Sequence, residues 1–181
     1  MVLQFSSGYA QHADEIVALF RSAFAASEGA DEGRLIATLV TNFFAATAED
    51  DLFVFTAWSG SELTGCIVFS RLTFDRDDRT VFVLGPVAVA TQHQRQGIGQ
   101  KLLNYGLADI ANHGVDIAVT YGDPAYYSKV GFSPVTRQQV PPPMALQYPH
   151  GWLAQSLDGG EFRPLQGPSR CVDALNSPEY W

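Results

Sequence analysis

The stretch that most constrains the fold is residues 80–103, where a valine-rich segment leads into a glycine-containing loop and then an amphipathic helical pattern. TVFVLGPVAVA (80–90) is typical of a strand. Gly85-Pro86 in its middle is unusual, because proline cannot donate to a sheet ladder and glycine weakens a strand interior. We therefore expect a bulge at this point, and a local parting from the neighbouring strand.

The next segment, TQHQRQGIGQKLL (91–103), suits an anion-binding loop. A helix N-terminus leaves about four N–H groups unpaired and adds partial positive charge, and glycine lets a phosphate approach the backbone. A dinucleotide fingerprint would need a third glycine where Leu102 stands, and a Walker motif would need Gly-Lys-Ser/Thr, whereas Lys101 follows Gln100. Two interpretations remain: a phosphate loop, and a helix start that merely contains two glycines.

Elsewhere the hydrophobic spacing predicts alternating elements. Helical patterns begin near Asp14 and Leu35, and the segments 52–58 and 63–74 are expected to form a hairpin. DRDDR, which follows, is expected to be a solvated loop. The order β, α, α, β, β, β, α, β, α, β predicts a mixed sheet with helices on its faces.

A short helix is expected after the strand VDIAVTY. In GDPAYYSKVGF, Asp123 can cap the helix and Pro124 suits its first position, so the helix should run to about Lys129. Beyond residue 138 the sequence predicts irregular structure with one or two more strands.

Composition excludes several classes of protein. With 181 residues, one domain is expected, and the net charge of −8 argues against a nucleic-acid binder. No apolar run approaches the ~20 residues of a membrane span, and no secretory signal is recognisable, so we expect a cytoplasmic protein. Cys66 and Cys171 lack metal spacing and are expected to be reduced thiols, with no metal site.

Three features in register resemble the acetyl-CoA-binding core of the GNAT N-acetyltransferase superfamily: LGPVAV, then QRQGIG, then YYSKVGF. Gln94 to Gly99 match the pyrophosphate loop of that family, and Tyr126 to Phe132 match its aromatic-Tyr-x-x-x-Gly-Phe segment. LGPVAV with GDPAYYSKVGF is most similar to the YhbS-like subgroup of predicted bacterial acetyltransferases. The detailed match covers about residues 80–135.

The resemblance implies an α/β protein (α+β mixed sheet) with the GNAT acyl-CoA N-acyltransferase fold. Its central, mostly antiparallel sheet would be splayed at the Gly85-Pro86 strand and flanked by about four helices. A single N-acetyltransferase domain would span residues 1–181, with the cofactor-binding core at about 80–135 and an irregular C-terminal extension at about 138–181.

Acetyl-CoA is the implied cofactor, and the resemblance assigns roles to individual residues. Tyr127 would be the general acid toward the CoA sulfur, because a phenol of pKa about 10 is neutral at pH 7 and can donate. A backbone N–H near Val87 would stabilise the oxyanion. The cofactor-binding residues would be Val87, Ala88, Val89, Gln94, Arg95, Gln96, Gly97, Ile98, Gly99, Gln100, Lys101, Tyr126 and Tyr127.

No acid or histidine stands in LGPVAVA, where many family members place a glutamate base. Either a water chain removes the proton of the amine, or an acid between the N-terminal helices does. Glu28, Asp31 and Glu32 lie in that break, where the family usually binds its acceptor. The implied partner is a small-molecule or peptide amine, with neither nucleic acid nor membrane, and the aromatic tail would suit a homodimer.

Two functions are therefore compared. The first is an acetyl-CoA-dependent N-acetyltransferase that moves an acetyl group to a primary amine by direct attack in a ternary complex. The alternative is a non-catalytic acyl-CoA-binding sensor or regulatory module with the same fold. The missing strand carboxylate keeps the alternative open, whereas the loop and Tyr127 favour the enzyme.

Overall fold

A computed structural model describes residues 2–181, which divide into two compact units. The first unit comprises Met1–Phe69 and Pro86–Gly106, and the second comprises Ser70–Gly85 and Leu107–Trp181. Three elements contribute residues to both units: β3 (Glu62–Phe74), β4 (Asp77–Val89) and α3 (Ile98–Asn112).

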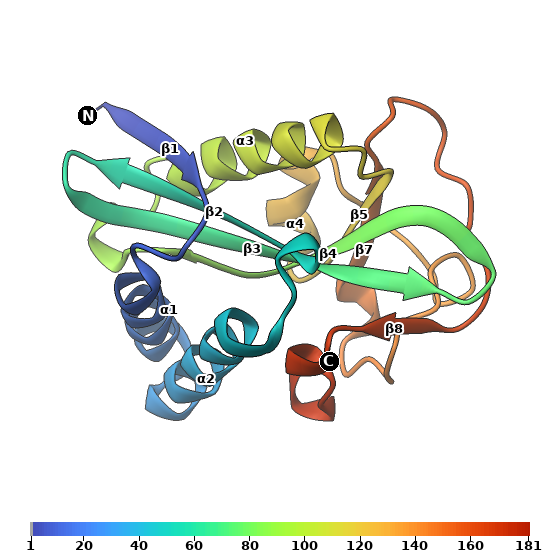
Figure 1. Cartoon of the computed structure of the whole chain (residues 1–181), viewed down its shortest axis with the longest axis horizontal. Helices are drawn as coiled ribbons and strands as arrows, with labels where there is room; N and C mark the ends of the chain where they lie inside the picture. Colours follow the sequence, from blue (N-terminus) through green and yellow to red (C-terminus); the bar gives the residue numbers. More distant parts are fainter. Residues whose placement is uncertain (1) are drawn as a thin grey trace. The chain divides into compact units, whose positions relative to one another are not determined.

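In the first unit, two helices follow the first strand and precede the second. The elements are β1 (Leu3–Ser7), α1 (Ala13–Glu28), α2 (Ala30–Ala46) and β2 (Leu52–Ser59). β1 pairs antiparallel with β2, and β2 neighbours β3. The two helices lie side by side (Figure 1), and Gly33 permits this closeness, because a Cβ there would lie 2.6 Å from the carbonyl oxygen of Arg21.

The core of the first unit forms where the start of α3 meets β2 and β3. Phe55, Ile67 and Phe69 are fully buried there. Gly106 of α3 lies against all three side chains, and a Cβ at Gly106 would lie 2.8 Å from Ile67 Cδ1. The helix that the sequence predicts here therefore packs one face directly on the sheet.

The second unit carries the remaining strands: β5 (Ile117–Tyr121), β6 (Ser133–Pro134), β7 (Trp152–Ser156) and β8 (Ser169–Cys171). β4 and β5 are parallel, whereas β5 with β7, β6 with β7 and β3 with β8 pair antiparallel. The β4–β5 register ends at Leu84 opposite Thr120, directly before Gly85, whose φ is 153°. The predicted α/β class with a mixed sheet and four α-helices is confirmed. Within residues 2–181, no helix is long and apolar enough to cross a membrane.

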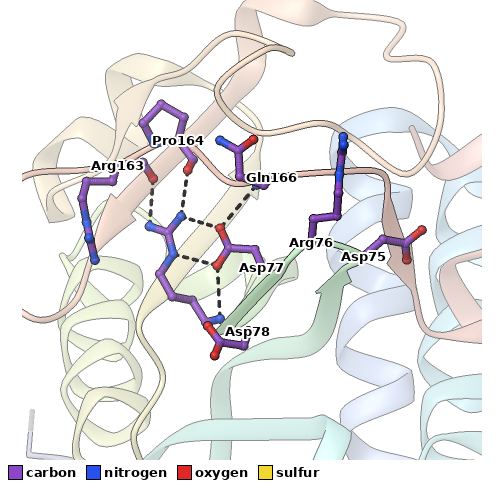
Figure 2. A pocket seen from close by; sticks show the side chains of 8 residues that line it. Asp75, Arg76, Asp77, Asp78, Arg163, Pro164 and Gln166 are labelled. Carbon is purple, nitrogen blue, oxygen red and sulfur yellow. Dashed lines mark hydrogen bonds and ion pairs between the residues drawn. The ribbon is translucent and has the colours of Figure 1, made fainter.

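Only Asp75 and Arg76 of the DRDDR stretch form the exposed turn that we expected, and the rest of it belongs to a strand. Asp77 and Arg79 belong to β4, and their side chains are only 9% and 19% exposed. The Arg79 guanidinium donates to the Asp77 carboxylate at 2.7 and 2.9 Å, and to the carbonyls of Arg163 and Pro164 at 2.9 and 2.8 Å (Figure 2). Gln166 N–H also donates to Asp77. This ion pair holds the C-terminal extension against the β3–β4 hairpin.

We expect Asp77→Asn to lower the free energy of unfolding by about 1–3 kcal/mol, because it leaves a largely buried guanidinium without its carboxylate. The hydrogen bond from Arg79 holds the pKa of Asp77 below its usual value. Since the folded pKa is the lower one, the stabilisation is complete above the unfolded pKa of about 4 and is lost as the pH falls through the folded pKa. Urea unfolding should therefore show a deficit at pH 7 that shrinks in acid. Asn at the exposed Asp78 is the control.

Candidate active site

The loop between β4 and α3 has an unusual backbone. After a short 3-10 turn (Thr91–His93), Arg95 adopts φ 62° and Gly97 adopts φ 78°, both left-handed. A positive φ is uncommon for a residue other than glycine, and it often marks a functional loop. Such left-handed positions can aim backbone N–H groups into a shared anion-binding concavity.

Helix α3 begins at Ile98, directly after this loop. Its first backbone hydrogen bond runs from Lys101 N–H to Gly97 C=O at 3.1 Å. The N–H groups of Ile98, Gly99 and Gln100 therefore precede the helical hydrogen-bond ladder, and the helix dipole adds partial positive charge at the same place. The loop and the first turn of α3 can together bind an anion without a lysine or arginine side chain.

Hydrogen bonds near the start of β3 and the end of β4 hold this loop in place. Gln94 Nε2 donates to the carbonyl oxygen of Val89 at 3.2 Å, and Ala90 N–H donates to Thr64 C=O at 2.8 Å. The first unit thus brings the loop next to the last residues of β4. There Ala88 is buried, while Val87 and Val89 are half-buried.

His93, at the end of the 3-10 turn before the loop, is largely buried and lies against Glu62. Its side chain is 14% exposed, and its Nε2 lies 3.0 Å from a carboxylate oxygen of Glu62. Gln92 Nε2 donates to the same oxygen at 3.0 Å. The hydrogen bond from Gln92, together with the nearby His93 imidazole, holds the pKa of Glu62 below its usual value. Glu62 thereby anchors the turn that precedes the loop.

The short helix α4 (Pro124–Tyr127) lies in the second unit and carries the two candidate tyrosines. The sequence predicted its start correctly: Asp123 accepts a hydrogen bond from Ala125 N–H at 2.9 Å, and Pro124 occupies the first position. A 3-10 turn continues it to Val130, and Gly131 ends it in the left-handed region at φ 98°.

The ring of Tyr127 packs tightly against the chain. A Cβ at Gly122 would lie 2.6 Å from its Cε2 atom, so only glycine permits the ring to occupy this position. Tyr126 and Phe132 make edge-to-face contacts with it, with ring centroids at 5.0 and 5.9 Å. These contacts fix the plane of the phenol.

The Tyr127 hydroxyl interacts with a residue that sequence reasoning missed. That residue is Thr120, which is 1% exposed and whose side chain lowers the pKa of Tyr127. Thr120 Oγ1 itself is fixed by the hydrogen bond that it donates to the carbonyl of Leu84 at 3.0 Å. In the sequence, Thr120 reads as one more position of a buried strand.

Burial raises the pKa of Tyr127 above its usual range, and the hydrogen bond to Thr120 opposes this effect only in part. Burial raises the pKa of Tyr126 as well. A phenol with a raised pKa keeps its proton at neutral pH and can donate it.

The three acids proposed for the acceptor gather at the junction of α1 and α2. Glu28 is the last residue of α1, and Asp31 and Glu32 lie in the first turn of α2. Asp31 forms an ion pair with Arg34, so its charge is partly compensated. Glu28 is exposed.

The fold is that of solved acetyltransferases. It is similar to a GNAT family acetyltransferase from Brucella melitensis in complex with acetyl-CoA, with a TM-score of 0.76, 24% identity, and coverage of 97% of this chain and 99% of that one. It is also similar to YhbS from Escherichia coli in complex with CoA, with a TM-score of 0.82, 21% identity, and coverage of 97% and 92%.

Residues 13–132 match the Acetyltransferase (GNAT) family, and the chain belongs to this family. Over 156 residues it is 29% identical to the uncharacterised N-acetyltransferase YjhQ of E. coli K12, spanning 83% of this chain and 82% of YjhQ. YhbS of the same organism is 32% identical over 71 residues, 39% of this chain and 42% of YhbS. The resemblance read from the sequence is confirmed.

Proposed function

We propose that this protein is an acetyl-CoA-dependent N-acetyltransferase that moves an acetyl group to a primary amine by direct attack in a ternary complex. One observation carries the proposal. The left-handed Arg95 and Gly97 follow β4 and lead straight into the first turn of α3, where the N–H groups precede the helical hydrogen-bond ladder. Membership of the GNAT family and its neighbours' complexes with acetyl-CoA and CoA support the same cofactor.

In this proposal, the backbone from Arg95 to Gln100 cradles the pyrophosphate, and Lys101 stands at its edge. A net charge of −8 is then no obstacle, because amides and a helix dipole hold the anion. Gln94 contributes by bracing the loop through its bond to Val89, and Gln96 contributes by a longer contact, 3.5 Å, to the carbonyl of Gln92.

The pantetheine arm would pair with backbone groups of Val87, Ala88 and Val89 as an added strand. Their place at the end of β4, beyond Gly85-Pro86, supports this role. The β4–β5 register has already ended there, so the backbone beyond is suited to a ligand.

The amine nitrogen would attack the thioester carbonyl carbon, forming the C–N bond, and an N–H near Val87 would stabilise the oxyanion. The C–S bond then breaks, and Tyr127 gives its proton to the departing sulfur. The attacking nitrogen loses one proton to water, and Tyr127 regains one from solvent. Tyr126 would line the cofactor beside Tyr127.

The acceptor would be a small-molecule or peptide amine, approached through Glu28, Asp31 and Glu32, whose charges suit an ammonium group. We also propose a single domain over residues 1–181, a cytoplasmic location and a homodimer.

A thiol-release assay with acetyl-CoA and a panel of primary amines tests this function against the non-catalytic alternative. We expect CoA release that depends on the amine, with the acetylated amine appearing in equal amount by mass spectrometry. Tight binding of acetyl-CoA without turnover of any amine would instead identify a sensor module.

A further inference from the structure

A second feature of the same unit as Tyr127 is a cavity of about 360 Å³ at the end of β5. Tyr121 and Gly122 contribute from the end of that strand, and Pro124 contributes from the start of α4. The other lining residues are Tyr148, His150 and Gly151, from the segment that leads into β7. The cavity has the size of a small ligand pocket.

One wall of the cavity is rigid. The Tyr121 hydroxyl accepts a hydrogen bond from Tyr148 N–H at 2.6 Å. Its ring packs on two buried tryptophans, with centroids 6.2 Å from Trp152 and 6.5 Å from Trp181. Those tryptophans donate their own indole N–H groups to backbone carbonyls at 2.9 Å. The aromatic surface that faces the cavity is therefore preorganised.

Another lining residue carries an aromatic ring that the fold does not bury. Tyr148 is 72% exposed, which makes it the most exposed large aromatic side chain within residues 2–181. Its backbone is fixed by the bond to Tyr121, while its ring remains exposed. A planar ligand bound in the cavity against the tyrosine rings would gain aromatic contacts and cover the exposed ring.

The cavity is adjacent to the proposed general acid. Gly122 lines it, and the same residue lies against the ring of Tyr127. Gly122 N–H donates to Gly151 C=O at 2.9 Å, which joins the two walls at this point. A molecule in the cavity would therefore lie beside the residue that protonates the leaving sulfur.

The lining selects the chemistry of the occupant. Nearly all of its surface is apolar, so a polyhydroxylated or polycationic molecule would lose hydration there without finding partners. An aromatic ring is the group that such a lining, with two tyrosines, suits best. We propose that the cavity binds the aromatic body of the acceptor, so that the substrate is an arylalkylamine. This inference rests on the proposed N-acetyltransferase function.

The test compares 2-phenylethylamine and tryptamine with spermidine and an aminoglycoside in the thiol-release assay. We expect kcat/KM to be at least about tenfold higher for the two aromatic amines. Tyr148→Ala should raise KM for 2-phenylethylamine about tenfold and leave KM for acetyl-CoA unchanged. Tyr148→Phe, which keeps the aromatic ring and the backbone N–H, should recover most of the KM effect of Tyr148→Ala.

The possible failures differ from one another. If spermidine or the aminoglycoside is the better substrate, or if Tyr148→Ala leaves KM for 2-phenylethylamine unchanged, the cavity is not the acceptor site and the acetyltransferase function stands. If acetyl-CoA binds and no amine is turned over, the proposed function itself fails, and this inference fails with it.

Discussion

Replacing Tyr127 by phenylalanine is expected to lower kcat by about 10²-fold or more while leaving KM for acetyl-CoA nearly unchanged. The ring contacts with Gly122 and Phe132 survive in this variant, because they involve ring atoms rather than the hydroxyl. What is lost is the proton for the departing thiolate, together with the hydrogen bond to Thr120. The loss of one buried hydrogen bond costs about 1 kcal/mol of stability, too little to unfold the chain.

Steady-state kinetics with a saturating amine measure this effect, and Tyr126→Phe is the matched control. Tyr126 is the sequence neighbour of Tyr127 and is also partly buried, but it is not the proposed proton donor. The Tyr126→Phe variant should therefore keep most of the wild-type kcat. Since the pKa of Tyr127 is raised, its proton remains bound throughout neutral and mildly alkaline pH. The rate should therefore show no alkaline decline below about pH 10 that belongs to this group. A wild-type kcat in Tyr127→Phe would remove Tyr127 from the mechanism.

The variant Thr120→Val distinguishes the loss of the Tyr127 proton from the loss of the contact that positions the Tyr127 hydroxyl. This variant removes the partner of the Tyr127 hydroxyl and the bond to the Leu84 carbonyl, and it keeps the β-branched shape of a strand residue. We expect kcat to fall less than in Tyr127→Phe, and Thr120→Ser to restore it. Equal loss in Thr120→Val and Thr120→Ser would mean that packing, rather than the hydroxyl, matters at this position.

Local signals made most of the fold predictable. Asp123-Pro124 predicts the start of α4 because a side-chain cap and a fixed proline φ act within a few residues, and the structure has both. Gly85-Pro86 likewise pointed to the irregularity in β4, and the register with β5 ends directly before it. In each case the controlling interaction is encoded by neighbours in the sequence.

Other features depend on contacts between distant residues. DRDDR looked like a solvated loop because its partners, the carbonyls of Arg163 and Pro164, lie more than 80 residues away. Thr120 and Gly122 gave no signal for the same reason. Their importance arises from the Tyr127 ring and hydroxyl, which reach them only once β5 and α4 have formed.

Replacing Gly97 by glutamate is expected to weaken acetyl-CoA binding by at least about 100-fold. A side chain at φ 78° strains the backbone, and a carboxylate beside the proposed pyrophosphate repels it. Two like charges about 4 Å apart repel by about 4 kcal/mol at an effective dielectric constant of 20, and the exposure of this loop reduces that figure. A Cβ at Gly97 would meet no protein atom within 4 Å, so the Cβ itself clashes with nothing in the free protein.

Isothermal titration calorimetry with acetyl-CoA, at low and high salt, measures the affinity. Gly97→Ala introduces the backbone strain without the charge and should lose much less affinity than the glutamate variant. Gly114→Glu is the matched control, because Gly114 also has a positive φ, 86°, and open space around it, but follows the C-terminus of α3 instead of preceding its N-terminus. The loss in Gly97→Glu should shrink at high salt, since screening weakens the repulsion. If Gly97→Glu folds and binds acetyl-CoA as tightly as Gly114→Glu does, the loop does not hold the pyrophosphate.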